Sequence, residues 1–294
     1  MRRWMVGVGL LAALMLFSES AHPDEKPTVV ATFSILADLT QRIGGDHVRA
    51  LTLVGANGDA HVFEPGPKES TELAEASVLV ANGLGFEPWL QRLEEASGFK
   101  GTRVIAADGV TALKGNEELG PTDPHAFQDV SNAEIYAANI AKGLSAADPA
   151  HAADFKANAD KLVADMAALD KEVKTQLAAV PQDRRRILTS HDAFQYFGKA
   201  YGIEFVAAQG VSTEAEPTAK DLAKIIRQAR DGHLSAIFLE NMADPRLAET
   251  VSRESGVRMG GELYADALSE PDGPAPDYLS LVRYNVKQLL AAMQ

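Results

Sequence analysis

The stretch "PAHAADFKANADKLVADMAALDKEVKTQLAAV", residues 149–180, contains one proline, at its first position, and no glycine. Pro149 follows Asp148, and proline is favoured in the first turn of a helix, so the stretch predicts one long helix. At about 1.5 Å per residue, roughly 30 residues form a rod of about 45 Å, comparable to the diameter of a small domain. Larger apolar residues and one alanine recur in steps of three and four and predict a single buried stripe: Phe155, Ala159, Leu162, Met166, Leu169, Val173, Leu177 and Val180.

The segments on either side of this helix both alternate between short apolar runs and helical patterns. Before it, β-like runs such as "TVVATF" (28–33) alternate with amphipathic segments such as "SILADLTQRIGG" (34–45). After it, "RRILTS" (185–190) opens a second series of the same kind. Such alternation is typical of a mainly parallel sheet flanked by helices. We therefore predict an α/β protein of two lobes joined by one long rigid helix, with an N-terminal lobe over residues 27–147, the connecting helix over 148–180 and a C-terminal lobe over 181–294.

Local signals mark two helix starts and one loop. Ser131 and Glu134 have the spacing of a capping box, which predicts that a helix begins beside Ser131. Asp192 is placed to cap the helix that follows "RRILTS". The segment 109–124 shows no strong period, so we predict a loop there.

The N-terminus has the three parts of a secretory signal peptide. Two arginines precede an uncharged stretch of 14 residues over positions 4–17, and small residues follow at Ser18 and Ser20. We predict cleavage after Ser20, so that residues 1–20 are the signal peptide. A membrane anchor is the alternative, but a spanning helix needs roughly 20 apolar residues.

The composition favours a soluble exported protein that binds small cations. The 294 residues include no cysteine, which excludes structural disulfides and the attachment of a lipid to an N-terminal cysteine. The formal net charge is -13, and loss of Arg2, Arg3 and Glu19 with the signal peptide would make it -14. An acidic surface disfavours nucleic acid and anionic membranes and favours small cations. We therefore expect a periplasmic protein that is not lipid-anchored and binds no nucleic acid.

Three histidines and one aspartate lie in loops where a small ligand could bind. His61 lies in "NGDAHVFEPGPKE", and His125 lies in "GPTDPHAFQDVS" before a predicted helix. His191 follows "RRILTS" at the carboxyl end of a predicted strand, the edge where ligands bind in open α/β sheets. Asp266 lies in an acidic loop near the end of the second lobe. Each lobe thus offers two candidate ligands, and three imidazoles with one carboxylate suit a tetrahedral Zn²⁺ in the interlobe cleft.

Four acidic residues are candidates to support these ligands. Asp59 and Glu64 flank the first of the histidines, Asp123 precedes the second by two positions, and Glu240 lies at the end of a predicted strand. A ligating histidine commonly donates its other ring N–H to a carboxylate, which fixes the orientation of the ring. We predict that these acids orient the ligands and do not bind the metal themselves.

Five segments, in order along the chain, resemble signature segments of the zinc- and manganese-binding receptors of ABC import systems. They are "DAHVFEPGPKE", "PTDPHAFQDVSNA", "LTSHDAFQYFGKAYGIEF", "IFLENMADPRLAETVSRESGV" and "ELYADALSE", and the likeness covers nearly the whole mature chain. The resemblance implies a rigid helical backbone between two lobes and places the family's ligands on His61, His125, His191 and Asp266. Many zinc receptors of this type carry a long histidine-rich loop before the second ligand, whereas "GVTALKGNEELGPTDP" is short and has no histidine.

The resemblance and the donor set together imply capture and delivery of a metal, not catalysis. We expect a monomeric extracytoplasmic receptor that binds one Zn²⁺ per chain and delivers it to the membrane permease of an ABC transporter. Receptors of this type tuned for manganese or iron often carry a glutamate at the third ligand position, where this chain has His191, and imidazole suits zinc. A manganese or iron receptor of the same type is the alternative. Whether the metal arrives free or from a carrier protein is left open.

A secreted zinc hydrolase is the rival from another class. It would use three of these ligands and a water, with Glu64 or Glu240 as the general base. The sequence contains neither HExxH nor GxSxG. Four protein ligands would also fill the position that a catalytic zinc keeps open for water. A surface adhesin of the same fold is a third interpretation, and it would need a membrane or wall anchor, which we do not predict.

Overall fold

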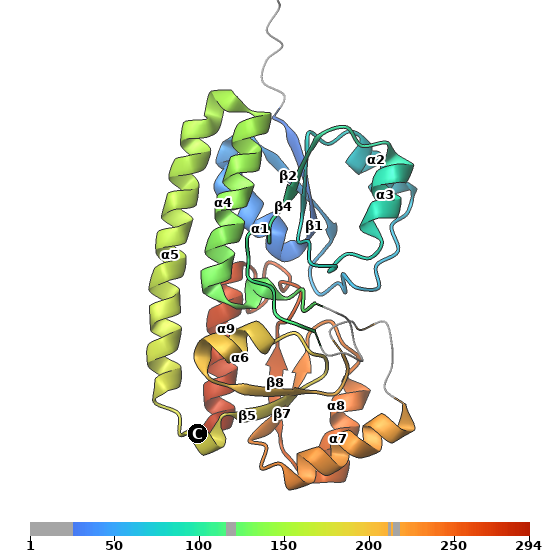
Figure 1. The fold of residues 1–294 in the computed structure, drawn as a ribbon, viewed down its shortest axis with the longest axis vertical. Helices are drawn as coiled ribbons and strands as arrows, with labels where there is room; N and C mark the ends of the chain where they lie inside the picture. Colours follow the sequence, from blue (N-terminus) through green and yellow to red (C-terminus); the bar gives the residue numbers. More distant parts are fainter. Residues whose placement is uncertain (1–25, 116–121, 211–212, 214–217) are drawn as a thin grey trace, which may run out of the picture.

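The computed structural model describes residues 26–115, 122–210, 213 and 218–294 (Figure 1). Within these residues the chain forms two parallel four-stranded sheets, each flanked by helices, which confirms the predicted α/β class. The predicted signal peptide, residues 1–20, lies outside the described residues. Among the helices of the described part, we find no segment long and apolar enough to cross a membrane.

The first lobe contains the sheet of order β2-β1-β3-β4. Strand β1 is built from the β-branched and aromatic run "TVVATF" and is buried after its first residue, as expected of a central strand in a parallel sheet. The strands are β1 (Thr28–Phe33), β2 (Arg49–Val54), β3 (Val78–Ala81) and β4 (Thr102–Ile105), and the helices are α1 (Ser34–Gly44), α2 (Pro67–Ala74), α3 (Leu90–Ser97) and α4 (Val130–Ala147).

Helix α4 does not begin as the sequence predicts. Asp129, not Ser131, is the N-cap residue, and the Asp129 carboxylate accepts a hydrogen bond from the backbone N–H of Ser131. An aspartate in the preceding position offers an acceptor that reaches the same free N–H groups, so the capping-box assignment was wrong. The segment 109–124, predicted to be a loop, forms only an isolated bridge between Lys114 and Thr122 within its described part.

The second lobe repeats the strand order of the first as β6-β5-β7-β8. Its helices α7 and α8 start at side-chain caps, Thr218 and Asp244, whereas α6 starts after Phe194 and not at the predicted cap Asp192. The strands are β5 (Arg186–Thr189), β6 (Glu204–Ala207), β7 (Ala236–Glu240) and β8 (Met259–Leu263), and the helices are α6 (Gln195–Tyr201), α7 (Ala219–Asp231), α8 (Pro245–Ser255) and α9 (Tyr278–Met293).

Strand β8, with the sequence "MGGEL", was not anticipated from the sequence because two glycines interrupt its apolar pattern. The structure shows why small residues are needed there. A Cβ atom on Gly260 would lie 2.6 Å from the Phe238 ring, and Gly261 has a φ of +115°. The register between β7 and β8 shifts at the same level, between Ile237 and Phe238.

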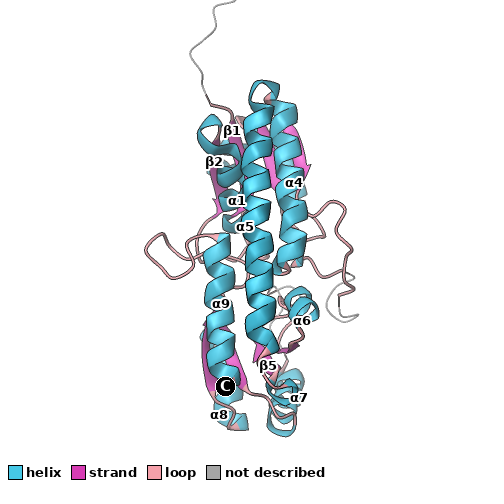
Figure 2. Ribbon diagram, turned by 90° about the vertical axis from the view of Figure 1, so that its left-hand side faces the viewer, coloured by secondary structure: helices cyan, strands magenta, loops and turns pink. Residues whose placement is uncertain are grey.

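Helix α5 (Ala152–Ala178) runs beside both lobes, next to α1 and α4 of the first and α9 of the second (Figure 2). It begins later than predicted because residues 149–151 form a separate 3₁₀ turn. The predicted apolar stripe is buried along its whole length, from Phe155 to Leu177 and on to Val180 beyond the helix end.

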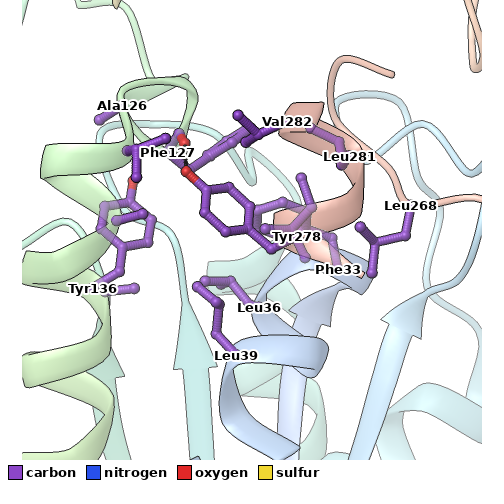
Figure 3. Close-up of a cluster of buried hydrophobic side chains, with 14 of the residues drawn as sticks. Phe33, Leu36, Leu39, Ala126, Phe127, Tyr136, Leu268, Tyr278, Leu281 and Val282 are labelled. Carbon is purple, nitrogen blue, oxygen red and sulfur yellow. Dashed lines mark hydrogen bonds between the residues drawn. The ribbon is translucent and has the colours of Figure 1, made fainter. Parts of the chain in front are cut away.

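A single hydrophobic cluster continues from the first lobe into the second. Figure 3 shows part of it, where Phe33 and Leu36 of the first lobe lie close to Tyr278 of α9. A second, separate cluster lies under α7 and α8 and contains Leu188, Ala208, Ile225, Ala229, Ile237, Ala248 and Val251. The second lobe therefore has one face tied to the first lobe and one face with a core of its own.

Candidate metal centre

The four candidate ligands come from loops that lie between the two lobes. His61 follows β2, His191 follows β5 and Asp266 follows β8, so all three lie beyond the carboxyl ends of strands. His125 directly precedes the 3₁₀ turn Ala126–Gln128 that leads into α4. The carboxyl ends of parallel strands meet at one edge of a sheet, and the two sheets present these edges to each other.

The structure brings these four side chains together. Each offers one ligand atom, and these atoms all lie within 4.8 Å of one another. The Nε2 atoms of His61 and His125 are 3.1 Å apart, and His191 Nε2 is 3.0 Å from Asp266 Oδ2. Asp266 Oδ2 is also 3.3 Å from His61 Nε2, and Asp266 Oδ1 is 3.6 Å from His125 Nε2. Donors around a tetrahedral ion at about 2.0 to 2.2 Å are about 3.3 to 3.6 Å apart, so the group has the size that one ion requires.

The group is almost completely removed from solvent. His61 is 4% exposed, and His125, His191 and Asp266 are each 0% exposed. A buried carboxylate beside three buried imidazoles is costly unless the charges are compensated by protons or by a cation. The burial and the composition of the group therefore point to a bound cation.

Burial and mutual charge set the protonation of the group in the absence of metal. Burial lowers the pKa of the His61 imidazole. Burial acts in the same direction on His125, but the charge of Asp266 and the hydrogen bond with Asp123 outweigh it and raise the pKa of His125 to about 9. The same balance raises the pKa of His191 well above its usual value. The pKa of Asp266 stays far below its usual range because the charges of His125 and His191 outweigh its burial. Protons thus occupy two imidazoles that a metal would need in the neutral form.

Two of the predicted supporting acids contact the ring nitrogens that face away from the group. Asp123 Oδ1 lies 2.8 Å from His125 Nδ1 and also accepts the backbone N–H of His125 at 2.9 Å. Glu240 Oε2 contacts His191 Nδ1, and Glu240 Oε1 accepts the backbone N–H of His191 at 2.9 Å. Each contact leaves Nε2 of the ring as the atom that faces the other ligands, and holds the ring in that orientation.

The other two predicted acids have different positions. Asp59 accepts the backbone N–H of His61 at 2.9 Å, so it holds the loop and not the imidazole. Glu64 is exposed and lines a surface pocket with Trp89 and Arg92, so the structure places it outside the buried group.

Two aromatic residues near His61 were not identified from the sequence. The Phe86 ring packs edge-on against His61 and His125, with centroid distances of 4.7 and 5.7 Å. The indole N–H of Trp89 donates to the carbonyl of Ala60, the residue before His61, at 2.7 Å. Aromatic residues in a loop are usually core residues, so "GFEPW" carries no signal that distinguishes this role.

Comparison with known proteins places this fold and site in a family. The chain matches the family described as "Zinc-uptake complex component A periplasmic" over residues 29–292. The chain belongs to this family. It is 32% identical to the "Iron ABC transporter substrate-binding lipoprotein MtsA" of Streptococcus pyogenes, over 97% of this chain and 94% of that protein. It is 30% identical to the "Manganese ABC transporter substrate-binding lipoprotein scaA" of Streptococcus gordonii, over 96% and 94% of the two chains.

Solved structures of similar proteins show the same fold. The periplasmic zinc binding protein TroA from Treponema pallidum superposes with a TM-score of 0.86 at 27% identity, covering 91% of this chain and 99% of that one. The Mn-bound periplasmic metal binding protein from Candidatus Liberibacter asiaticus gives a TM-score of 0.83 at 29% identity, covering 92% and 100%.

Membership of the zinc-uptake component A family fixes the general role of the chain. It is the substrate-binding component of a metal ABC transporter, and it acts outside the cytoplasm with a membrane permease as its partner. The family consists of receptors, not enzymes, so the hydrolase alternative is not supported. The positions of Glu240, held against His191, and of the exposed Glu64 agree with this, since neither acid is placed as a free general base in the group.

Proposed function

We propose that this chain captures one Zn²⁺ between its two lobes and delivers it to the permease of an ABC transporter. The proposed ligands are the Nε2 atoms of His61, His125 and His191 and the carboxylate of Asp266. The observation that supports this best is the convergence of these four ligand atoms in one buried group, two from each lobe. Imidazole nitrogen suits zinc, and four protein ligands enclose an ion that is to be carried intact.

A manganese or iron receptor is the second candidate. Asp266 Oδ1 is buried and has no hydrogen-bond partner among the described residues, and it faces His125 Nε2 at 3.6 Å. If both carboxylate oxygens bound the ion, the group would offer five donors, two of them oxygens, which suits a harder ion better. The relatives named for iron and manganese favour the same alternative.

The metal content of the protein in its own compartment tests this choice. Tighter binding of zinc in the test tube does not identify the cargo, because a nitrogen-rich site binds Zn²⁺ more tightly than Mn²⁺ in any case. We expect elemental analysis of protein isolated from its native compartment to give about one zinc per chain, and none for a His191→Ala variant isolated in parallel. Manganese or iron as the bound metal would replace the zinc assignment, and the absence of any metal would contradict the site.

We also propose that residues 1–20 are a cleaved signal peptide and that the protein is periplasmic and not lipid-anchored. The relatives named above are called lipoproteins, but this sequence has no cysteine to carry a lipid. Mass spectrometry of the exported protein should find an unmodified N-terminus at Ala21. An intact or acylated N-terminus would contradict this.

The division of labour along the chain is part of the same proposal. We propose that residues 27–147 and 181–294 act as two lobes joined by the helical segment 148–180, and that the receptor works as a monomer. The metal reaches it either free or from a carrier protein. Light scattering of the metal-loaded protein should give the mass of a single chain.

A further inference from the structure

A hydrogen bond joins the loop of Asp266, in the second lobe, to the turn that follows His125, in the first lobe. Gln128 Nε2 donates to the carbonyl of Ala265 at 2.6 Å, although the two residues are 137 positions apart. Gln128 is only 2% exposed, and its own backbone N–H donates to the carbonyl of His125 at 3.0 Å. One side chain therefore links the residue next to Asp266 to the backbone of His125.

The rest of the Asp266 loop is also held through its backbone. The side chain of Asn285 in α9 accepts the N–H of Tyr264 at 2.9 Å and donates to the carbonyl of the same residue at 2.7 Å. On the other side of Asp266, the N–H of Leu268 donates to Ser34 Oγ and the Leu268 carbonyl accepts the N–H of Asn57, both at 2.9 Å. Ser34 and Asn57 belong to the first lobe, so the loop is fastened to both lobes.

We propose that Gln128 is a positioning residue that holds His125 and Asp266 as a pre-assembled pair of ligands across the two lobes. This inference rests on the proposed function, because it assigns a role in metal binding. With the link intact, a metal meets two ligands already at their mutual distance, and Asp266 cannot retract while the turn after His125 stays in place. Its main effect is therefore to slow the release of bound metal.

The energetic basis is the burial of the bond. The Ala265 carbonyl lies on a residue that is 0% exposed, so loss of the Gln128 donor deprives a buried acceptor of its partner. The loop can relieve this only by moving, and movement of Ala265 moves Asp266. Groups that orient metal ligands typically contribute at least about tenfold to metal affinity.

The test compares two variants that each remove one buried hydrogen bond between this turn and the second lobe. Gln128→Met keeps the length and packing of the side chain but removes the donor. The control is Tyr278→Phe, which removes the bond from the Tyr278 hydroxyl to the carbonyl of Phe127, 2.7 Å long, and leaves the Asp266 loop untouched. Zinc affinity is measured by competition with a chelator, zinc release by stopped-flow mixing with excess chelator, and stability by the melting temperature of the metal-free protein.

We expect Gln128→Met to raise the zinc Kd and the release rate about tenfold, and Tyr278→Phe to change both less than twofold. The two variants should lower the melting temperature of the metal-free protein to a similar extent. Equal release rates for Gln128→Met and wild type, or equal effects of the two variants, would overturn the positioning role.

A second variant keeps the test decisive if Gln128→Met folds poorly. Gln128→Asn keeps the amide but is one methylene too short to make the 2.6 Å bond, and we expect it also to release zinc about tenfold faster. Wild-type release from Gln128→Asn would overturn the proposal. If the wild-type chain itself binds no zinc or manganese, the proposed function fails, which is a different result from normal binding by the variants.

Discussion

The two lobes have the same strand order and contribute to the centre in similar ways, but they are anchored differently. Each lobe supplies one histidine whose outer ring nitrogen contacts a carboxylate, His125 with Asp123 in the first and His191 with Glu240 in the second. The first lobe lies within the large hydrophobic cluster, which continues into α6 and α9. The outer layer of the second lobe, α7 and α8, lies over the separate cluster (Figure 1).

This difference suggests how a receptor can bind tightly and still release its cargo. The ligands are mounted where the two lobes share one core, so their mutual positions are defined by packing. The α7–α8 layer has a smaller core and can move at lower cost without disturbing the shared cluster. The comparison makes measurable claims about each lobe separately.

The largest expected effect comes from removing one ligand from each lobe. Metal at about a thousandfold excess over its Kd should stabilise the wild type by about 4 kcal/mol, and His125→Ala and His191→Ala should each lose most of this. The measurement is the rise in melting temperature on addition of zinc. His47→Ala is the control, since His47 stacks on His151 outside the group. A wild-type rise in either ligand variant would show that its lobe does not contribute to the site.

The supporting carboxylates should produce the next largest effect. Asp123→Asn and Glu240→Gln keep the side-chain shape but weaken the acceptor for the ring N–H, so each should reduce zinc affinity by about ten- to a hundredfold. Calorimetric titration against a competing chelator measures both. Asp192→Asn is the matched control, because the Asp192 carboxylate accepts from Gln195 and not from a ligand ring. Unequal losses would end the view that the two lobes orient their histidines equivalently.

The pH dependence follows from the charge balance in the metal-free group. His125 has a pKa of about 9, so it is protonated at pH 7 and must lose its proton to bind a metal. Zinc affinity should therefore rise by at least about tenfold per pH unit between pH 7 and pH 8.5. The stability of the metal-free protein should change in the opposite direction. Because the pKa of His125 is raised on folding, its contribution is present below pH 6.5 and is lost as pH rises through about 9.

These two trends are measured by zinc competition and by thermal unfolding of metal-free protein across the same buffers. Asp266 stays ionised throughout this range because its pKa is depressed, so it adds no proton of its own. Affinity that is flat from pH 7 to pH 8.5 would contradict the protonation assigned to His125.

The smallest effect concerns the two cores. Backbone amides in α7 and α8 should exchange with deuterium at least about tenfold faster than those in α4 and α5, because the separate cluster opens without disrupting the shared one. Zinc should slow exchange in the ligand loops and leave α7 and α8 nearly unchanged. Uniform exchange across both lobes, measured by mass spectrometry, would remove the distinction between the two cores.

The features that the sequence predicts well are those with a local period. The steps of three and four in residues 149–180 identify the long helix and its buried face, and the alternation on either side identifies two parallel sheets. Ligand candidates followed from the rule that ligands bind beyond the carboxyl ends of parallel strands, which selected His191, and from loops with flanking acids, which selected His61 and His125.

The features that were missed depend on partners that no local pattern shows. Strand β8 is hidden by glycines that the Phe238 ring requires, and the cap of α4 lies two residues before the expected one because Asp129 also offers an acceptor. The bond from Gln128 to Ala265 joins residues 137 positions apart, so neither end carries a recognisable signal.

The most direct test of the account is a crystal structure of the zinc-loaded protein, with anomalous diffraction collected at the zinc absorption edge. We expect one anomalous peak per chain between the lobes, about 2.0 to 2.2 Å from Nε2 of His61, His125 and His191 and from a carboxylate oxygen of Asp266. A zinc peak elsewhere, or one bound by ligands from only one lobe, would contradict the claim that the two lobes share a single ion.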